Sequence, residues 1–318
     1  MKKISLSLCV AMMMMGVMMV PASATAQEKR TYVFAQRDSA LRLDVWSPEV
    51  ARADRACVVA LFGGGFVEGE RDNELQREIA RLLTGRGYTV VSPDYRLGLK
   101  DTAHNKQYKG LSGVADMFQW TIDMAAEDCA EAVAWTVAHA GELNINPERM
   151  VLTGCSAGAI TVAQLDYYRC NGESESGARV SSLLPQGWKP SAVVPYAGAV
   201  MTKGKPKYKT APAPTMFMHG MKDKIVAYKR FPQLMSHALR GGSTLFDVFK
   251  KEGYPVWIVR FEGIGHEVAS FLPGSVDLFC GFVEQVFNGC VTTLDATMSD
   301  KSLVPTKFTD MTVIDLYK

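Results

Sequence analysis

Two patterns of hydrophobic positions follow one another along this chain. Near its start, apolar and polar residues alternate over 32–35 and 41–46, on either side of a turn at 37–39. This alternation predicts an antiparallel hairpin at the edge of a sheet. Mainly apolar runs come next, at 57–62, 89–91, 150–153, 192–194, 215–218 and 256–259. Unbroken runs of this kind are typical of parallel strands that helices cover on both faces.

Apolar residues at helical spacing separate these runs. The helical segments are 75–83, a long one at 117–137, and two more at 231–239 and 276–287. Strands that alternate with helices predict one α/β domain with a mostly parallel central sheet, an N-terminal antiparallel hairpin and helices on both faces. Residues 97–113 are expected to be irregular.

The N-terminus has the composition of a secretory signal peptide. A charged start at 1–3 precedes an apolar stretch over 4–20, and small residues supply a cleavage site before Gln27. A membrane anchor is less favoured, because the run is short and ends in a processing site. The protein is therefore expected to be exported, periplasmic or secreted, with no membrane span after cleavage. The expected divisions are a signal peptide at 1–26, the α/β domain at 27–290 and a polar C-terminal extension at 291–318.

Composition and charge narrow the choice of partners. The chain has 318 residues, of which 47% are hydrophobic and 21% charged, so it can bury one large core. Cleavage of the signal would remove two of its 35 basic residues and none of its 33 acidic ones, which leaves no net charge. Neither nucleic acid nor an anionic membrane is indicated as a partner. The oligomeric state is left open.

Six cysteines would remain after cleavage: Cys57, Cys129, Cys155, Cys170, Cys280 and Cys290. In an exported protein some of them could form disulfides. Cys129 and Cys170, on helices that flank the run at 150–153, are one possible pair. No two cysteines have the spacing of metal ligands.

The strongest chemical signal comes directly after the run at 150–153. Residues 154–158 read Gly-Cys-Ser-Ala-Gly and lead into a helical stretch that starts at Ala157. A serine on a sharp strand-to-helix turn needs glycines two positions before and after it, because the flanking chain passes closely there. The helix N-terminus also places N–H groups beside the hydroxyl. We therefore predict Ser156 as a nucleophile rather than Cys155, since the glycines are centred on Ser156.

A nucleophilic serine needs a base, which in this arrangement follows the later strands. The chain has five histidines: His104, His139, His219, His237 and His266. The first two precede Ser156, His219 adjoins a strand end and His237 falls in a helical pattern. His266 alone follows the last apolar run, in a glycine-containing loop, and is the predicted base.

The acid that orients the base is predicted to be Asp223. It lies just beyond the run at 215–218, at the strand end where sites on such sheets gather. It would accept the imidazole N–H of His266 and stabilise the charged ring. Asp247 is the main rival, placed in a helix-to-strand connection at the opposite edge, and Glu262 is a weaker one.

Backbone donors for a tetrahedral oxyanion are predicted after the run at 57–62. The segment there reads Phe62-Gly-Gly-Gly-Phe66, and glycines leave backbone N–H groups open to a substrate. The predicted oxyanion hole consists of the N–H groups of Gly64, Gly65 and Ala157.

Several motifs occur in a characteristic order: Phe62-Gly-Gly-Gly-Phe66, Asp94-Tyr95-Arg96-Leu97, Gly154-Cys-Ser-Ala-Gly158, His219-Gly-x-x-Asp223 and Gly265-His266. In this order they resemble the α/β-hydrolase family, in its carboxylesterase-like branch with a His-Gly-Gly-Gly oxyanion motif. The resemblance covers about residues 30–290. It is greatest to exported bacterial acetyl or feruloyl polysaccharide esterases. Phe62 stands where that branch usually has His, which puts a hydrogen bond that orders the loop at risk.

The resemblance implies a serine carboxylic-ester hydrolase that forms an acyl-enzyme, requires no cofactor, and acts on a small-molecule or polysaccharide-borne acetyl or feruloyl ester. A serine peptidase or acyl-peptide hydrolase with the same order of residues is one alternative. A non-catalytic binding protein on this fold is another. Aromatic residues of the expected pocket walls could contact a ring or simply pack in the core: Phe66, Tyr108, Phe118, Trp120 and Trp188.

Overall fold

The computed structural model describes residues 28–101, 105–107, 109–172, 174–231, 237–313 and 315, so the predicted signal peptide lies outside the described residues. The strands are β1 (Glu28–Gln36), β2 (Ala40–Ser47), β3 (Cys57–Leu61), β4 (Thr89–Pro93), β5 (Met150–Cys155), β6 (Ala192–Tyr196), β7 (Ala199–Lys203), β8 (Thr215–Gly220), β9 (Arg230–Phe231), β10 (His237–Gly241), β11 (Val256–Phe261) and β12 (Leu294–Met298). The α-helices are α2 (Glu74–Thr84), α4 (Gly110–Ala138), α5 (Ala157–Asn171), α6 (Glu175–Leu183), α7 (Gly242–Glu252), α8 (Val276–Phe287) and α9 (Lys307–Asp310).

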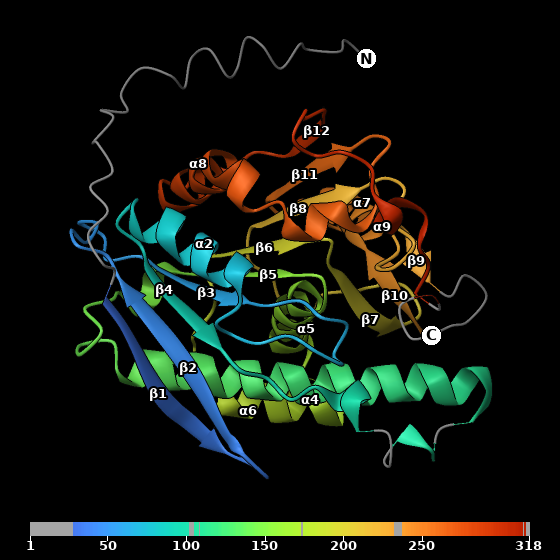
Figure 1. Cartoon of the computed structure of the whole chain (residues 1–318), viewed down its shortest axis with the longest axis horizontal. Coiled ribbons are helices and arrows are strands. Elements are labelled where there is room, and N and C mark those ends of the chain that lie inside the picture. Colours follow the sequence, from blue (N-terminus) through green and yellow to red (C-terminus); the bar gives the residue numbers. More distant parts are fainter. Residues whose placement is uncertain are drawn as a thin grey trace.

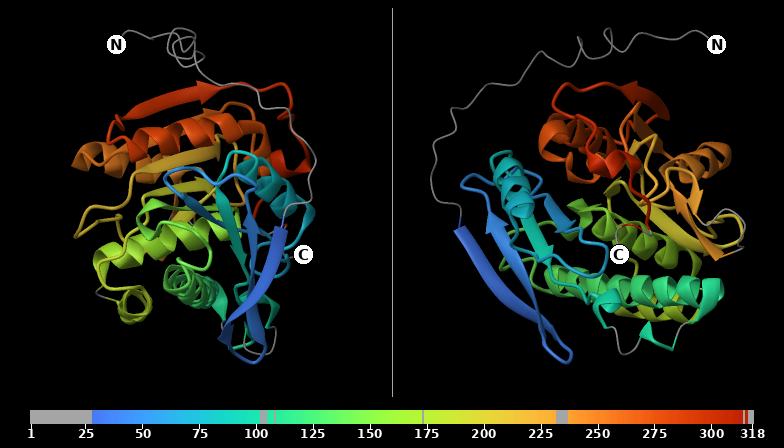
Figure 2. Two further views of the ribbon diagram at one scale, coloured as in Figure 1. Left: turned by 90° about the vertical axis from the view of Figure 1, so that its left-hand side faces the viewer. Right: turned by 45° about the vertical axis from the view of Figure 1, so that its right-hand side comes forward.

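Nine strands form one sheet, in the order β1-β2-β4-β3-β5-β6-β8-β11-β12. β2 is antiparallel to both β1 and β4, whereas every further neighbouring pair is parallel. The hairpin of β1 and β2 stands at one edge of the sheet and β12 at the other (Figure 2). The predicted mostly parallel sheet with an N-terminal hairpin is confirmed, and all six apolar runs are parallel strands.

Helices cover both faces of the sheet, as predicted (Figure 1). Side chains alternate between the faces along each strand. In β5, Met150 and Leu152 belong to a core that includes α4, α5 and α6, whereas Val151 belongs to a second core with α2 and α8. α7 packs against β8 and β11 in a third cluster, through Phe249 and Phe217. Burial on both faces explains why these strands show no polar alternation.

The helix predicted over 231–239 is wrong in its described part. Phe231 ends β9, and residues 237–241 form β10, which pairs with β7 and β9 in a separate three-stranded sheet. Ala238 and Leu239 are buried there, and such a short apolar run suits a buried strand as well as a helix. The helix of this region is α7, and Asp247, expected in a connection, lies within it.

The C-terminal extension takes part in the fold despite its polar composition. β12 lies parallel to β11, so β11 is not the last strand of the sheet. The indole N–H of Trp257 donates to the carbonyl of Thr292 at 2.9 Å, which holds the start of the extension against β11. The extension therefore adds an edge strand and the short helix α9.

The six cysteines of the described part are all free, so the possible disulfide between Cys129 and Cys170 does not form. Both side chains are buried, where a thiol packs as a small apolar group. Within the described ranges, no helix combines the length and the apolar character that a membrane crossing requires.

Candidate active site

Ser156 lies in a strained turn between β5 and α5. Its φ of 51° and ψ of −113° are a conformation that residues with a side chain rarely adopt. It is the N-cap of α5, but its hydroxyl makes no capping hydrogen bond. The backbone N–H instead donates to the carbonyl of Tyr196 at 3.0 Å. The turn is therefore held by its backbone, and the hydroxyl is directed elsewhere.

The two glycines of this turn are required because backbone contacts their α-carbons closely. A Cβ atom on Gly154 would lie 2.5 Å from the carbonyl carbon of Gly158, and one on Gly158 would lie 2.4 Å from the carbonyl oxygen of Phe62. Such distances leave no room for any side chain. The glycine spacing therefore has the physical cause that the sequence indicated: the end of β5, the start of α5 and the end of β3 pass one another at backbone distance.

The ring of His266 lies between Ser156 and Asp223. Its Nε2 is 2.8 Å from the Ser156 hydroxyl, and its Nδ1 is 2.8 Å from Oδ2 of Asp223. A carboxylate only accepts hydrogen bonds, so Nδ1 carries a proton, and Nε2 accepts from the serine hydroxyl whenever Nε2 is unprotonated. The structure thus brings these three predicted residues together in the order that allows the serine to lose its proton to the imidazole.

Asp223 lies in the turn after β8, with its side chain fully buried. Its Oδ1 accepts from the backbone N–H groups of Ile225 and Val226, both at 3.0 Å. Burial raises the pKa of Asp223, but the charge of His266 and hydrogen bonds from His219 and His266 outweigh it and lower the pKa to about 2. The carboxylate is therefore ionised at neutral pH.

His219 is a neighbour of this carboxylate to which the sequence assigned no role. Its Nδ1 accepts from the N–H of Gly242 at 3.3 Å, so Nε2 carries the proton. Nε2 donates to the carbonyl of Val226 at 2.9 Å and lies 3.5 Å from Oδ2 of Asp223. The sequence did contain a signal for this contact: His219 and Asp223 are four residues apart. A tight turn directly after a strand brings residues at this spacing close together.

The rival candidates lie elsewhere. Among the described residues, the carboxylate that contacts His266 is that of Asp223; Asp247 lies on α7 and Glu262 follows the end of β11. Cys155 is buried, and burial raises the pKa of its thiol to about 12, so no thiolate forms near neutral pH. Of the remaining histidines, His139 stacks on Trp135, His237 lies on β10, and His104 lies outside the described residues.

The triple-glycine loop lies directly beside the serine. A Cβ atom on Gly63 would be 3.3 Å from the Cβ of Ser156. Gly64 and Gly65 have φ values of 129° and 61°, which glycine adopts readily. Ala157 is the first residue of α5, where backbone N–H groups have no partner within the helix. The three predicted donors therefore belong to two segments that meet at Ser156.

Phe62, the departure from the usual motif, is anchored by Tyr95. The Tyr95 hydroxyl donates to the carbonyl of Phe62 at 2.7 Å, and the two rings stack with centroids 4.4 Å apart. The order that a histidine would give to this loop is thus supplied by a tyrosine from the segment after β4.

Of the aromatic residues expected at the pocket walls, Phe66 is buried in the main core, and Phe118 and Trp188 pack against that core. Phe66 is 2% exposed. The indole N–H of Trp188 donates to the carbonyl of Pro147, before the start of β5, whereas Ser156 follows the end of that strand. Phe118 packs against the core on α4, which also carries Trp120, and Tyr108 lies outside the described residues.

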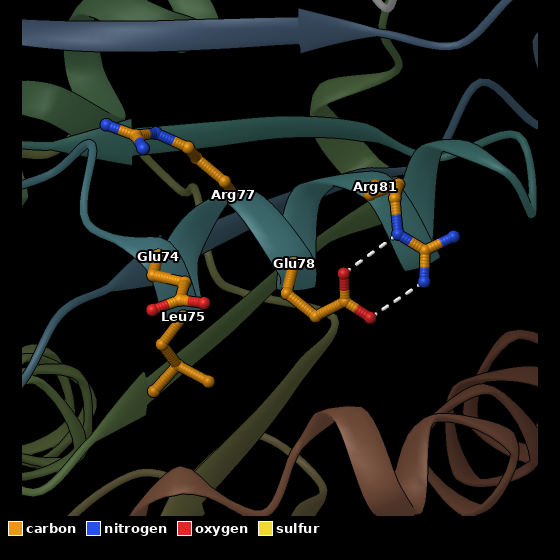
Figure 3. A pocket seen from close by; sticks show the side chains of 5 residues that line it. All are labelled: Glu74, Leu75, Arg77, Glu78 and Arg81. Carbon is orange, nitrogen blue, oxygen red and sulfur yellow. Dashed lines mark hydrogen bonds and ion pairs between the residues drawn. The ribbon is translucent and has the colours of Figure 1, made fainter. Parts of the chain in front are cut away.

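A hollow on the surface of α2 offers no competing site. Its lining consists of Glu74, Leu75, Arg77, Glu78 and Arg81 (Figure 3). Glu78 and Arg81 form an ion pair at 2.7 Å, which is ordinary for an exposed helix surface. None of the predicted site residues lines this hollow.

Comparisons with known proteins agree with this architecture. Residues 15–168 match a model of the carboxylesterase family, and residues 119–221 match one described as alpha/beta hydrolase fold. Lipase 2 of Moraxella sp. (strain TA144) is 30% identical over 35% of this chain and 21% of its own length. An arylesterase of Saccharolobus solfataricus is 29% identical over 43% of this chain and 38% of its own length. The chain thus spans well under half of either relative.

Among solved structures, Thermogutta terrifontis esterase 2 phosphorylated by paraoxon is similar over 83% of this chain and 95% of its own, with a TM-score of 0.56 and 19% identity. Identity at this level bears on the fold alone. The chain therefore has the α/β-hydrolase fold, and the matches support its similarity to the carboxylesterase family.

Proposed function

We propose that the protein is a serine carboxylic-ester hydrolase. The observation that carries this proposal is the continuous hydrogen-bonded series from Ser156 through His266 to Asp223, with both contacts at 2.8 Å. Serine, imidazole and carboxylate in this order are the groups needed for acyl transfer. The similarity to an arylesterase and a lipase supports an ester rather than another acyl compound as substrate.

The reaction proceeds in two acyl transfers. Oγ of Ser156 attacks the ester carbonyl while its proton passes to Nε2 of His266, and the carbonyl electron pair moves onto oxygen. The tetrahedral oxyanion then collapses, the bond to the alcohol breaks, and the alcohol takes the proton from Nε2. Water repeats these steps on the acyl-enzyme, which releases the acid and restores the serine. Asp223 stabilises the imidazolium in both halves.

We assign the oxyanion hole to the N–H groups of Gly64, Gly65 and Ala157. The loop lies next to Ser156, since Gly63 is within contact distance of its side chain. Backbone donors that are fixed before the reaction stabilise the developing charge without reorganisation. Tyr95 contributes by holding the carbonyl of Phe62 at the base of the loop.

Acetyl or feruloyl esters of plant polysaccharides are the substrate class we put forward. This choice rests on the resemblance of the motifs and on the expected export of the chain, with residues 1–26 as signal peptide. Mass spectrometry of the N-terminal peptide of the exported protein should find a peptide that begins at Gln27, as glutamine or as pyroglutamate. A first residue inside 1–26, or recovery of the full chain in the membrane, would contradict the signal-peptide assignment.

The decisive test compares wild type with Ser156→Ala on p-nitrophenyl acetate, acetylated xylan and methyl ferulate. We expect kcat to fall by about 10⁶-fold in the variant. Cys155→Ala is the matched control, because it changes the neighbouring side chain and should keep activity. Paraoxon should add one phosphoryl group to wild type and to Cys155→Ala, detected by mass spectrometry, and none to Ser156→Ala. Full activity in Ser156→Ala, or no hydrolysis by wild type, would refute the proposal.

A further inference from the structure

The C-terminal segment 306–313, here called the clamp, contacts the loops that carry both His266 and Asp223. It contains α9, drawn in red in Figure 1. At its start, Thr306 bonds to Glu267, the residue after His266. At its end, the N–H of Val313 donates to the carbonyl of Lys224, the residue after Asp223, at 3.3 Å. One short segment therefore reaches both partners of the serine.

Glu267 is the anchor at the His266 side. Its Oε1 accepts from the N–H and hydroxyl of Thr306, both at 2.8 Å, and from the hydroxyl of Thr309 at 2.6 Å. Its Oε2 accepts from the N–H of Gly265 at 2.9 Å. The carboxylate thus joins the residue before His266 to two residues of the clamp, with four hydrogen bonds to one side chain.

Packing at this contact is as close as backbone allows. A Cβ atom on Gly265 would lie 2.6 Å from the Cα of Thr309, and Thr309 is 3% exposed. On the other side of the same loop, a Cβ atom on Gly220 would lie 2.0 Å from the carbonyl oxygen of Gly265. The histidine loop is therefore enclosed between the end of β8 and α9.

The far end of the clamp is also fixed. Thr312 forms a parallel bridge with Lys224, and Val313 is 8% exposed. Met311 packs against the main core. Lys224 and Asp310 add an exposed ion pair at 3.8 Å, which contributes little. Apolar burial and the backbone bridge therefore hold this end.

We propose that the clamp positions His266 and Asp223 for the reaction, with Glu267 as the positioning residue. This inference rests on the proposed ester hydrolysis. The two loops are also joined directly through their backbones, by a hydrogen bond from the N–H of Lys222 to the carbonyl of Ile264 at 2.9 Å. We expect that bond to keep the loops near each other when the clamp is absent. The clamp therefore sets the precise positions of His266 and Asp223, and the two loops still pack together without it. Misplacement of reacting groups by about 1 Å costs on the order of 10²-fold in rate.

The test compares a chain that ends at Pro305 with one that lacks only residues 316–318. The first loses the clamp, and the second keeps it. For the first we expect kcat on p-nitrophenyl acetate to fall about 10- to 100-fold while KM stays within about twofold, because substrate contacts are unchanged. The second should match wild type.

Thr309 supplies a finer pair of variants. Thr309→Val removes one hydrogen bond to Glu267 at constant shape and should lower kcat about threefold to tenfold. Thr309→Ser keeps the hydroxyl and should keep the kcat of wild type. A merely structural role would lower stability in both variants and leave the kcat of the folded enzyme unchanged.

Amide hydrogen exchange, read by mass spectrometry, tests the clamp without any substrate. In the chain that ends at Pro305, exchange should quicken over 219–226 and 262–270 and stay unchanged over 150–155. Unchanged exchange in the first two segments, or an unchanged kcat, would overturn the clamp. Faster exchange there in a protein whose wild type hydrolyses no ester would refute the proposed function and uphold the clamp. If 150–155 also exchanges faster, the truncation unfolds the sheet, and the Thr309 pair then decides.

Discussion

The serine and its two partners are positioned by different kinds of structure. Ser156 is held by glycines two positions away and by the ends of the strands beside it. Asp223 and His266 lie on loops joined by a backbone bond and by a C-terminal segment about 40 residues beyond His266. A local constraint of the first kind can be recognised from the five residues 154–158 alone. The second kind exists only when distant parts of the chain have come together.

Among the variants that test this comparison, the largest expected effect concerns Asp223, which distant segments hold in place. Asp223→Asn keeps the shape of the side chain but replaces the acceptor of the His266 N–H with an amide that can turn its NH₂ group toward the ring. The wrong tautomer of His266 is then favoured, and we expect kcat to fall about 10⁴-fold with little change in KM. Steady-state kinetics on p-nitrophenyl acetate measures this. Asp247→Asn, the same change on α7, should keep wild-type kcat; a comparable loss there would place the acid elsewhere.

Gly158→Ala tests the close backbone contacts that hold Ser156. The added methyl group meets the carbonyl oxygens of Leu61 and Phe62 at 2.5 and 2.4 Å, so β3 and α5 must separate. We expect a loss of about 1–3 kcal/mol or more in the free energy of unfolding, measured with urea. Gly281→Ala makes the same change on α8 where the added atom meets nothing within 4 Å, and it should stabilise by about 0.5–1 kcal/mol. Equal effects of the two variants would remove the steric explanation of the pentapeptide.

Low pH distinguishes the two kinds of support, because the turn at 154–158 contains no carboxyl side chain, whereas the loops of Asp223 and His266 depend on one. The pKa of Asp223 is lowered to about 2 in the folded protein, so its contribution is complete above the unfolded pKa near 4 and is lost as pH falls toward 2. That contribution is about 2 kcal/mol. Between pH 5 and pH 2, wild type should therefore lose about 2 kcal/mol more stability than Asp223→Asn. Parallel urea-unfolding curves for the two proteins across this range would contradict the assigned pKa.

The smallest effect sharpens the comparison at the oxyanion loop, which combines a local glycine motif with a distant tyrosine. Tyr95→Phe removes the hydrogen bond to Phe62, which we expect to reduce kcat about fivefold, equivalent to about 1 kcal/mol. Tyr32→Phe removes an exposed hydroxyl that bonds to Glu142 at 3.2 Å and should leave kcat unchanged. A loop that works equally well in both variants would show that the glycines alone set its shape.

The same division explains what could be predicted from the sequence. The six parallel strands and the strained serine were predictable, since burial on both faces and close backbone contact restrict residue types at fixed spacing. Residues 231–239 were not, because their apolar positions fit a strand or a helix and pairing with β7 decides between them. The placement of Trp188 away from the serine also depends on which end of β5 it packs against. Glu267 and the clamp left no signal, since a single Glu and scattered threonines acquire a role only through the fold.

The left-handed backbone of Ser156 has an evolutionary consequence. A strained residue of this kind costs the folded state about 1–3 kcal/mol, and glycine would relieve that cost. Stability therefore favours glycine at position 156, whereas the reaction requires serine. In a lineage selected for abundance alone, glycine would accumulate at this position, so the serine persists only where its hydroxyl is used. A glycine at this position in an otherwise similar chain would indicate a related protein that has lost the activity and kept the fold.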